Sequence, residues 1–256
     1  MIVDEVYSLK IEDVFPKSKF DTLIQCVQQE QRERILKFKL YKDALRTLAA
    51  DILIRDIIIN KGVLRNPDIL FKRNQYGKPC LKNTPNFHFN LSHSGQWVVC
   101  AVSNVPVGID IEEIVPIDLK IAIRFFAKEE IKDLFSLVEP ERLPYFYDLW
   151  TLKESYIKAI GKGLSIPLNT FALKKDANGG FYLQRGGQKG NYYFKQYKMF
   201  DNYTLSVCSI KNKFTDHVNV FDMDRLFMDF LREEGCYVNS GSEKPGRQRL
   251  SFPSSE

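Results

Sequence analysis

Three acidic residues and one lysine, in two short segments, carry the strongest chemical signal in this chain. Asp110 and Glu112 alternate with apolar residues, so a strand there would bury the apolar set and direct both carboxylates to the opposite face. Glu154 and Lys158 stand four apart in a helical pattern, so they share one helix face. If strand and helix meet, three oxygen ligands converge beside a cation, an arrangement that suits Mg²⁺ holding a phosphate.

Each half of this pattern also has an ordinary interpretation. Acidic residues spaced by two are common on solvated strand faces, and Glu–Lys pairs four apart are common on helix surfaces. The surroundings favour the chemical interpretation, because Trp150, Leu152 and Tyr156 make the helix apolar over much of its circumference and leave its few charges to line a cleft. Gly161 and Gly163 then end the helix.

Two further segments carry candidate anion contacts. Tyr76, Gly77, Lys78 and Pro79 favour a turn that places one cation on a constrained loop, either as a phosphate contact or as an ordinary surface lysine.

The second segment centres on His93, which follows an expected strand and stands among Ser92, Ser94 and Gly95. Hydroxyls and exposed backbone there could surround an anion, and a structural hydrogen bond is the alternative. We assign His88 to a structural role.

Together these segments resemble the signature motifs of the Sfp-type 4′-phosphopantetheinyl transferases. The four motifs occur in the family's order, at residues 76–79, 87–95, 108–112 and 150–164, and the resemblance extends to about residue 235. It implies an α+β fold of two similar, pseudo-symmetric lobes with the active site in the cleft between them. The implied reaction transfers the 4′-phosphopantetheine arm of coenzyme A to a serine of apo acyl or peptidyl carrier proteins of non-ribosomal peptide, polyketide or fatty acid synthases, releasing adenosine 3′,5′-bisphosphate.

The resemblance also implies residue roles. Coenzyme A would be bound by Arg34, Thr47, Tyr76, Gly77, Lys78, Pro79, Ser92, His93, Asp110 and Lys158, with Lys78, Ser92 and His93 near its 3′-phosphate. Asp110, Glu112 and Glu154 would hold Mg²⁺, while Lys158 contacts the pyrophosphate. Glu154 would accept the serine proton, or Glu130 would do so through a water. Where close relatives carry a basic residue, this chain has Gln31, which removes one phosphate contact.

Composition restricts the class of protein independently. The chain has 256 residues, 44% of them apolar, which is ample for a core, and a formal net charge of +5 that mildly favours anionic partners. The sequence has no dense run of basic residues of the kind that binds nucleic acid. It also has no apolar run long enough for a membrane span. Five scattered cysteines predict reduced thiols. We expect a cytoplasmic monomer.

The spacing of apolar residues alternates between helical and strand periods along the sequence. These changes divide the chain into two halves, each with helices and strands. We expect an N-terminal α+β lobe at residues 1–106, a C-terminal α+β lobe at 107–235 and a disordered tail or cloning remnant at 236–256. Helices are expected at 19–38, 42–59, 119–125, 128–138 and 142–160. Strands are expected at 2–9, near 69, and at 87–91, 98–102, 107–112, 171–174, 181–184, 192–197 and 203–208.

Two other classes of function remain open. A metal-dependent phosphodiesterase or nuclease would also need three carboxylates and a lysine, although a nuclease should be more basic. A non-catalytic module that binds coenzyme A or a carrier protein would not need all four groups. For the carrier protein, Phe125, Phe126 and Lys128 form a segment that offers both apolar and cationic contacts.

Overall fold

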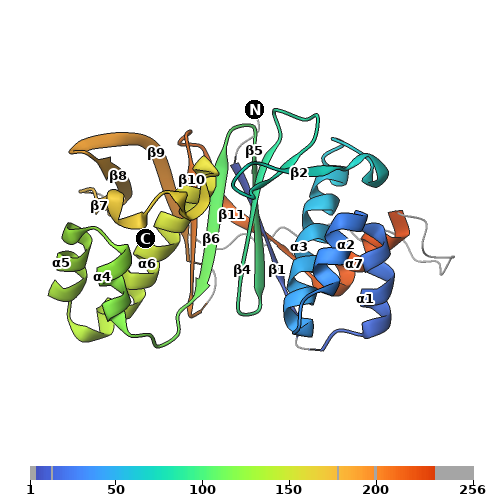
Figure 1. The fold of residues 1–256 in the computed structure, drawn as a ribbon, viewed down its shortest axis with the longest axis horizontal. Coiled ribbons are helices and arrows are strands. Elements are labelled where there is room, and N and C mark those ends of the chain that lie inside the picture. The colour runs from blue at the N-terminus through green and yellow to red at the C-terminus, as the bar shows by residue number, and fades with distance from the viewer. Residues whose placement is uncertain (1–3, 13, 178, 199–200, 234–256) are drawn as a thin grey trace. The chain divides into compact units, whose positions relative to one another are not determined.

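The computed structural model describes residues 4–12, 14–177, 179–198 and 201–233, so the expected tail at 236–256 lies outside the described residues. The chain forms two compact units, each built from several stretches of chain (Figure 1). The first unit comprises Met1–Glu5, Phe71–Gly95 and Ala101–Thr215, and the second comprises Val6–Leu70, Gln96–Cys100 and Asp216–Glu256. The α+β class is confirmed, whereas the expected boundary after residue 106, the pseudo-symmetry and the cleft stay predictions.

The first unit contains a five-stranded sheet in the order β6-β10-β9-β8-β7. Its strands are β6 (Val107–Glu113), β7 (Ala172–Lys175), β8 (Phe181–Arg185), β9 (Gln188–Tyr197) and β10 (Tyr203–Ser209). The helices of this unit are α4 (Ala122–Phe125), α5 (Lys128–Ser136) and the long α6 (Glu139–Ile160), which packs on β6 and β10. The same unit also holds β4 (His88–Ser94) and the short hairpin of β2 (Phe71–Arg73) and β3 (Pro79–Leu81).

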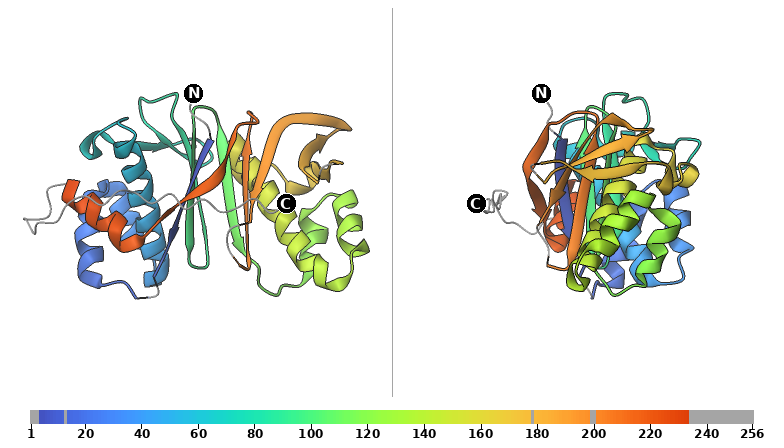
Figure 2. Two further views of the ribbon diagram at one scale, coloured as in Figure 1. Left: turned by 180° about the vertical axis from the view of Figure 1, so that it is seen from behind. Right: turned by 90° about the vertical axis from the view of Figure 1, so that its left-hand side faces the viewer.

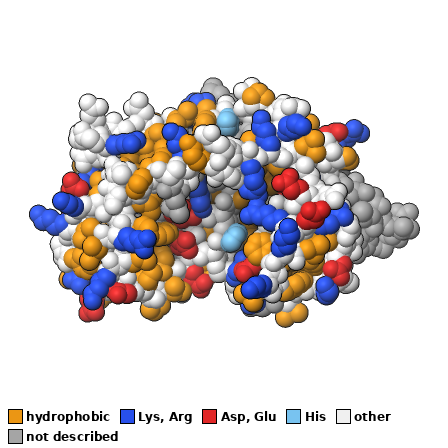
Figure 3. All heavy atoms as spheres, viewed as in Figure 1, with side chains coloured by type: hydrophobic (Ala, Val, Ile, Leu, Met, Phe, Trp, Pro, Cys, Tyr) orange, Lys and Arg blue, Asp and Glu red, His pale blue; other side chains and the backbone are white. Residues whose placement is uncertain are grey.

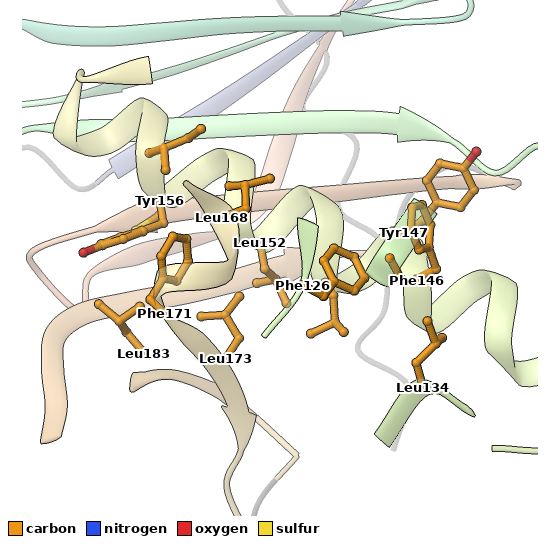
Figure 4. Close-up of a cluster of buried hydrophobic side chains, with 14 of the residues drawn as sticks. Phe126, Leu134, Phe146, Tyr147, Leu152, Tyr156, Leu168, Phe171, Leu173 and Leu183 are labelled. Carbon is orange, nitrogen blue, oxygen red and sulfur yellow. The ribbon is translucent and has the colours of Figure 1, made fainter. Parts of the chain in front are cut away.

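Helix α6 ends as its sequence predicts. Gly161 follows its last residue with φ of 76°, a left-handed conformation that favours glycine, and its amide bonds to the carbonyl of Ile157. The apolar face of α6 packs into the core cluster in Figure 4, where Leu152 and Tyr156 lie near Phe171. Phe126 is also in this core and only 2% exposed, so the expectation that it offers an apolar contact to a carrier protein was wrong.

The second unit is mainly helical. It contains α1 (Lys17–Leu23), α2 (Gln29–Leu36), α3 (Tyr41–Asn60) and α7 (Met223–Glu233), and α3 packs against each of the other three (Figure 2). Strands β1 (Asp4–Lys10), β5 (Trp97–Ser103) and β11 (Phe214–Phe221) have residues in both units and form a four-stranded sheet with β4 in the order β11-β1-β5-β4.

The single helix expected at 19–38 is interrupted. Helix α1 runs into a 3₁₀ turn at Ile24–Cys26, and the backbone is extended at Val27 before α2 begins. The Arg32 guanidinium explains the break, because it donates to the carbonyls of Ile24 and Gln25 at 3.0 and 2.8 Å. A continuous helix would need those carbonyls for its own backbone amides.

Two general expectations can be checked on the described residues. Cys26, Cys80, Cys100 and Cys208 are free thiols, as expected, and Cys236 lies outside the described residues. Within the described ranges, no helix combines the length and apolar character that crossing a bilayer requires.

Candidate active site

The candidate site is built on β6, at the edge of the five-stranded sheet. Ile109 and Ile111 are completely buried, as their alternation with the carboxylates predicts. Asp110 and Glu112 point to the other face, together with Gly108 two residues earlier, because successive strand residues alternate between faces. Helix α6 covers this second face.

Gly108 allows the close approach of α6 to β6. A β-carbon at position 108 would overlap the carbonyl oxygen of Ser155 and the amide nitrogen of Ala159, both in the backbone of α6. Any larger residue would push the helix away from the strand. The glycine thus brings Lys158, on the same turns of α6, within reach of Asp110.

An ion pair joins strand and helix at this point. The Lys158 ammonium lies 2.6 Å from Oδ1 of Asp110 and donates to the Ser92 hydroxyl at 2.9 Å. Ser92 in turn donates to the same Asp110 oxygen at 2.8 Å. Among the described residues, the other oxygen of Asp110, Oδ2, is buried and has no hydrogen-bond partner. This carboxylate therefore has one oxygen held by Lys158 and Ser92 and one buried oxygen without a partner among the described residues.

Glu112 is held by a second serine from the same strand, β4. The Ser94 hydroxyl donates to Oε2 of Glu112 at 2.9 Å and accepts the amide of Glu113 at 3.1 Å. Burial and the charge of Asp110 raise the pKa of Glu112, while Ser94, Lys158 and the indole of Trp150 act in the opposite direction.

Strand β4 thus contacts β6 through every second side chain. Asn90 accepts the amide of Ile109 at 2.8 Å, Ser92 holds Asp110, and Ser94 holds Glu112. The spacing of two places all three polar side chains on one face of β4. Asn90 had no expected role, and Ser94 was expected to help surround an anion; here Ser94 holds the Glu112 carboxylate instead.

Glu154 belongs to the same electrostatic group. Burial and the negative charges of Asp110 and Glu112 raise its pKa to about 7, against an opposing effect of Lys158. Asp110, Glu112, Glu154 and Lys158 are therefore brought together, as the sequence predicted. We call these four residues with Ser92 the acidic cluster.

The acidic cluster supplies the chemistry of a Mg²⁺ site without a preformed one. Within the part of the chain that the structure describes, no three His, Cys, Asp or Glu side chains are placed to hold a metal ion. The donors are nevertheless hard carboxylate oxygens, one of them the unpartnered Oδ2 of Asp110, and their mutual repulsion favours a cation. The donor types therefore suit Mg²⁺, while the described residues in their observed positions do not form a metal site.

Lys78 does not lie in the acidic cluster, and its ammonium bonds to backbone carbonyls. It donates to the carbonyls of Lys158, Val107 and Ala159 at 2.6, 2.9 and 3.4 Å. Burial lowers its pKa to about 8. This arrangement does not support the expected phosphate contact.

Glu130 is also separate from the acidic cluster. It is completely buried and pairs at 2.8 Å with the equally buried Lys153. Its two oxygens accept the amides of Ala127 and Leu173. A carboxylate with both oxygens occupied in the core is not placed to act as a base, and the choice between Glu130 and Glu154 stays a prediction.

The other expected coenzyme A residues belong to several different elements. Tyr76 is exposed, Gly77 has φ of 89° in the turn, Pro79 begins β3, and His93 is exposed on β4. Arg34, exposed on α2, and Thr47, which bonds to Asp43 within α3, lie in the second unit. Their roles toward coenzyme A stay predictions.

Comparisons with known proteins give the family. Residues 106–208 match the family model "4′-phosphopantetheinyl transferase superfamily", and residues 16–105 match "4′-phosphopantetheinyl transferase, N-terminal". The 4′-phosphopantetheinyl transferase Sfp of Bacillus subtilis is 36% identical over 87% of this chain and 99% of that protein. The transferase gsp of Aneurinibacillus migulanus is 38% identical over 88% of this chain and 95% of that protein.

A solved structure matches more weakly. A holo-(acyl-carrier-protein) synthase from Bacillus anthracis, in complex with CoA (3′,5′-ADP), covers 41% of this chain and 93% of its own, with 19% identity and a TM-score of 0.35. The sequence matches over most of the chain are decisive. This chain belongs to the 4′-phosphopantetheinyl transferase superfamily.

Proposed function

We propose that this protein transfers the 4′-phosphopantetheine arm of coenzyme A to a serine of an apo carrier protein. Family membership gives the reaction class, and the observation that carries the assignment of residues is the Lys158–Asp110 pair, open on one side and flanked by Glu112 and Glu154. The serine oxygen forms a bond to the β-phosphorus, and the bond to adenosine 3′,5′-bisphosphate breaks.

The residues of the acidic cluster have different roles in the proposed reaction. Asp110, Glu112 and Glu154 would hold Mg²⁺, and such an ion would offset negative charge on the pyrophosphate oxygens. Lys158 turns from Asp110 to those oxygens, which places a cation where negative charge develops. In this proposal Glu154 accepts the serine proton, because it lies one turn before Lys158 on the same face of α6.

The carrier protein docks, in this proposal, on the surface of α4 and α5. Hydrophobic, basic and acidic side chains are interspersed over this region (Figure 3). Ile123 is 61% exposed and Val138 63% exposed, close in sequence to the exposed Arg124, Lys128 and Lys132. An acidic carrier protein would be attracted by the cations and retained by the apolar contacts.

One assay tests the reaction. The purified protein is incubated with coenzyme A, Mg²⁺ and an apo carrier protein, and intact-mass spectrometry follows the carrier. We expect the mass gain of one phosphopantetheine arm, and none on a carrier whose acceptor serine is replaced by alanine.

Two outcomes would contradict the proposal. Hydrolysis of coenzyme A at the same rate without carrier protein would indicate a phosphodiesterase. Binding of coenzyme A with no product on several apo carriers would indicate a non-catalytic module.

A further inference from the structure

We propose that Lys78 and Asn74 are positioning residues that hold the last turn of α6, and with it Lys158 and Glu154, and that Lys78 does not bind a ligand phosphate. The proposal rests on the proposed transferase reaction for its activity readout. It concerns the β2–β3 hairpin and the turn that joins its two strands.

The contacts of Lys78 are the first observation. Its ammonium carries three protons and meets three backbone carbonyls, those of Lys158, Ala159 and Val107. Two of these carbonyls belong to the last turn of α6, and the third begins β6. One side chain therefore joins the helix that carries Lys158 to the strand that carries Asp110.

Asn74 makes the same connection from the other side of the turn. Its Nδ2 donates to the carbonyl of Gly161 at 2.7 Å. Its Oδ1 accepts the amides of Tyr76 and Lys78 at 2.9 and 3.0 Å, which shapes the turn that carries Lys78. The two residues thus act together on the end of α6.

The end of a helix needs such partners. The last four carbonyls of an α-helix have no amide partner within it, and a cation there also complements the helix dipole. In α6, the Gly161 amide donates to the carbonyl of Ile157, and the Lys78 ammonium donates to the carbonyls of Lys158 and Ala159. If Lys78 turned to a phosphate, these part-buried carbonyls would lose that partner.

Gly161 provides an independent observation. A β-carbon there would lie 3.0 Å from Cδ of Lys78 and 3.2 Å from Nδ2 of Asn74. Position 161 therefore needs glycine for its backbone angle and also for the close packing of both side chains. This close packing indicates that the hairpin and the end of α6 form a structural contact, and that the two side chains are not held free for a ligand.

The consequence for the reaction follows from distance. The carbonyl of Lys158 is held by Lys78 at 2.6 Å, while the ammonium of Lys158 contacts Asp110 at 2.6 Å. Glu154 lies one helical turn earlier. Small displacements of reacting groups have large effects on rate, so loosening this turn should reduce turnover rather than coenzyme A binding.

The test compares Lys78→Ala and Asn74→Ala with wild type, using coenzyme A and dephospho-coenzyme A as substrates. Lys82→Ala, an exposed lysine that follows β3, serves as the matched control. We expect both variants to lose about tenfold or more in kcat, with the KM for coenzyme A changed less than about twofold. The loss should be equal for the two substrates, and Lys78→Arg should recover part of it.

Hydrogen exchange adds a readout that does not depend on activity. Amides in the last turn of α6 should exchange faster in both variants, with the rest of the helix unchanged. If Lys78→Ala fails to fold, Asn74→Ala carries the same test, since its amide cannot act as a phosphate-binding cation.

Two results would overturn the proposal. The first is a KM increase at Lys78→Ala that is larger for coenzyme A than for dephospho-coenzyme A. The second is normal kcat and normal exchange at Asn74→Ala. If wild type itself shows no transfer, the proposed function fails, while the exchange measurement still decides the positioning role.

Discussion

Helix α6 carries two lysines, each paired with a carboxylate, in very different surroundings. Lys153 lies 2.8 Å from Glu130, and both side chains are 0% exposed. Lys158 lies 2.6 Å from Asp110, with the lysine 27% and the aspartate 4% exposed. Only four residues stand between the two lysines, yet one pair is fully buried and the other is partly exposed.

The Lys153–Glu130 pair is closed. Burial raises the pKa of Glu130 and lowers that of Lys153, so each charge depends on its partner and on backbone hydrogen bonds. Those bonds are complete on both sides: Lys153 donates to the carbonyls of Leu168 and Phe171, and Glu130 accepts the amides of Ala127 and Leu173.

The Lys158–Asp110 pair is open. One oxygen of Asp110 is held by Lys158 and Ser92, and, among the described residues, the other has no partner. Glu154 adds a carboxyl with a pKa raised to about 7. Removing one partner of the closed pair would leave a buried charge uncompensated, whereas the open pair already contains an oxygen without a partner among the described residues.

Breaking the closed pair should have the largest effect. Lys153→Met leaves Glu130 as an uncompensated buried charge, which should cost about 3–5 kcal/mol of folding free energy. Urea unfolding with an unchanged slope measures this. Adding Glu130→Gln should recover part of the loss, because the amide is neutral and still accepts a backbone hydrogen bond. A loss below about 1 kcal/mol would mean that the pair does not support the fold.

Breaking the open pair should remove activity instead. Asp110→Ala should reduce transfer by about 10²–10³-fold, because it removes both the proposed metal ligand and the partner of Lys158. Thermal unfolding should be close to that of wild type. Asp201→Ala, at an exposed turn, is the matched control and should retain full activity. Near-normal turnover of Asp110→Ala at saturating Mg²⁺ would contradict the metal assignment.

Glu112→Ala should be milder, with a loss of about tenfold, because Mg²⁺ readily keeps water in place of one protein ligand. Glu112 is half-buried and held by Ser94, so its removal disturbs less than that of Asp110. Activity against Mg²⁺ concentration should shift to higher concentrations. A larger loss at Glu112 than at Asp110 would reverse this ranking.

The two ion pairs also show which features of the site could be predicted from the sequence and which could not. The alternation around Asp110 and Glu112 and the spacing of Glu154 and Lys158 are local patterns, and each predicts the element that forms. The roles of Lys78 and Glu130 depend on partners that lie 80 and 23 residues away in sequence, Lys158 and Lys153. No local pattern distinguishes a capping or core charge from one that meets a ligand.

Some elements were missed although their signal was present. Helix α7 places Leu226, Phe227, Phe230 and Leu231 on one buried face, a spacing of three and four that predicts an amphipathic helix. Strand β11 was also not expected. The break at Val27 had no such signal in the sequence, because it depends on the hydrogen bonds that Arg32 donates to the carbonyls of Ile24 and Gln25 in the folded protein.

The smallest effect concerns Glu154 without divalent cation. Its pKa is about 7 in the folded protein against an ordinary 4.5, so the folded state holds the proton more tightly than the unfolded state. Wild type should therefore lose stability as pH rises from about 4.5 through 7, and no further loss should occur above that window. Glu154→Gln is neutral throughout and escapes this loss.

In chelator-treated protein at pH 8, Glu154→Gln should raise Tm by about 2–4 °C over wild type, and the difference should shrink as pH falls toward 4.5. Glu33→Gln, on the exposed surface of α2, should show no such pH-dependent difference. Mg²⁺ should remove most of the gain, because a bound cation offsets the repulsion that Glu154 feels from Asp110 and Glu112. An unchanged or lower Tm for Glu154→Gln at pH 8 would mean that Glu154 is not strained by its neighbours, and the open pair would then lack the charge excess that should attract a metal ion.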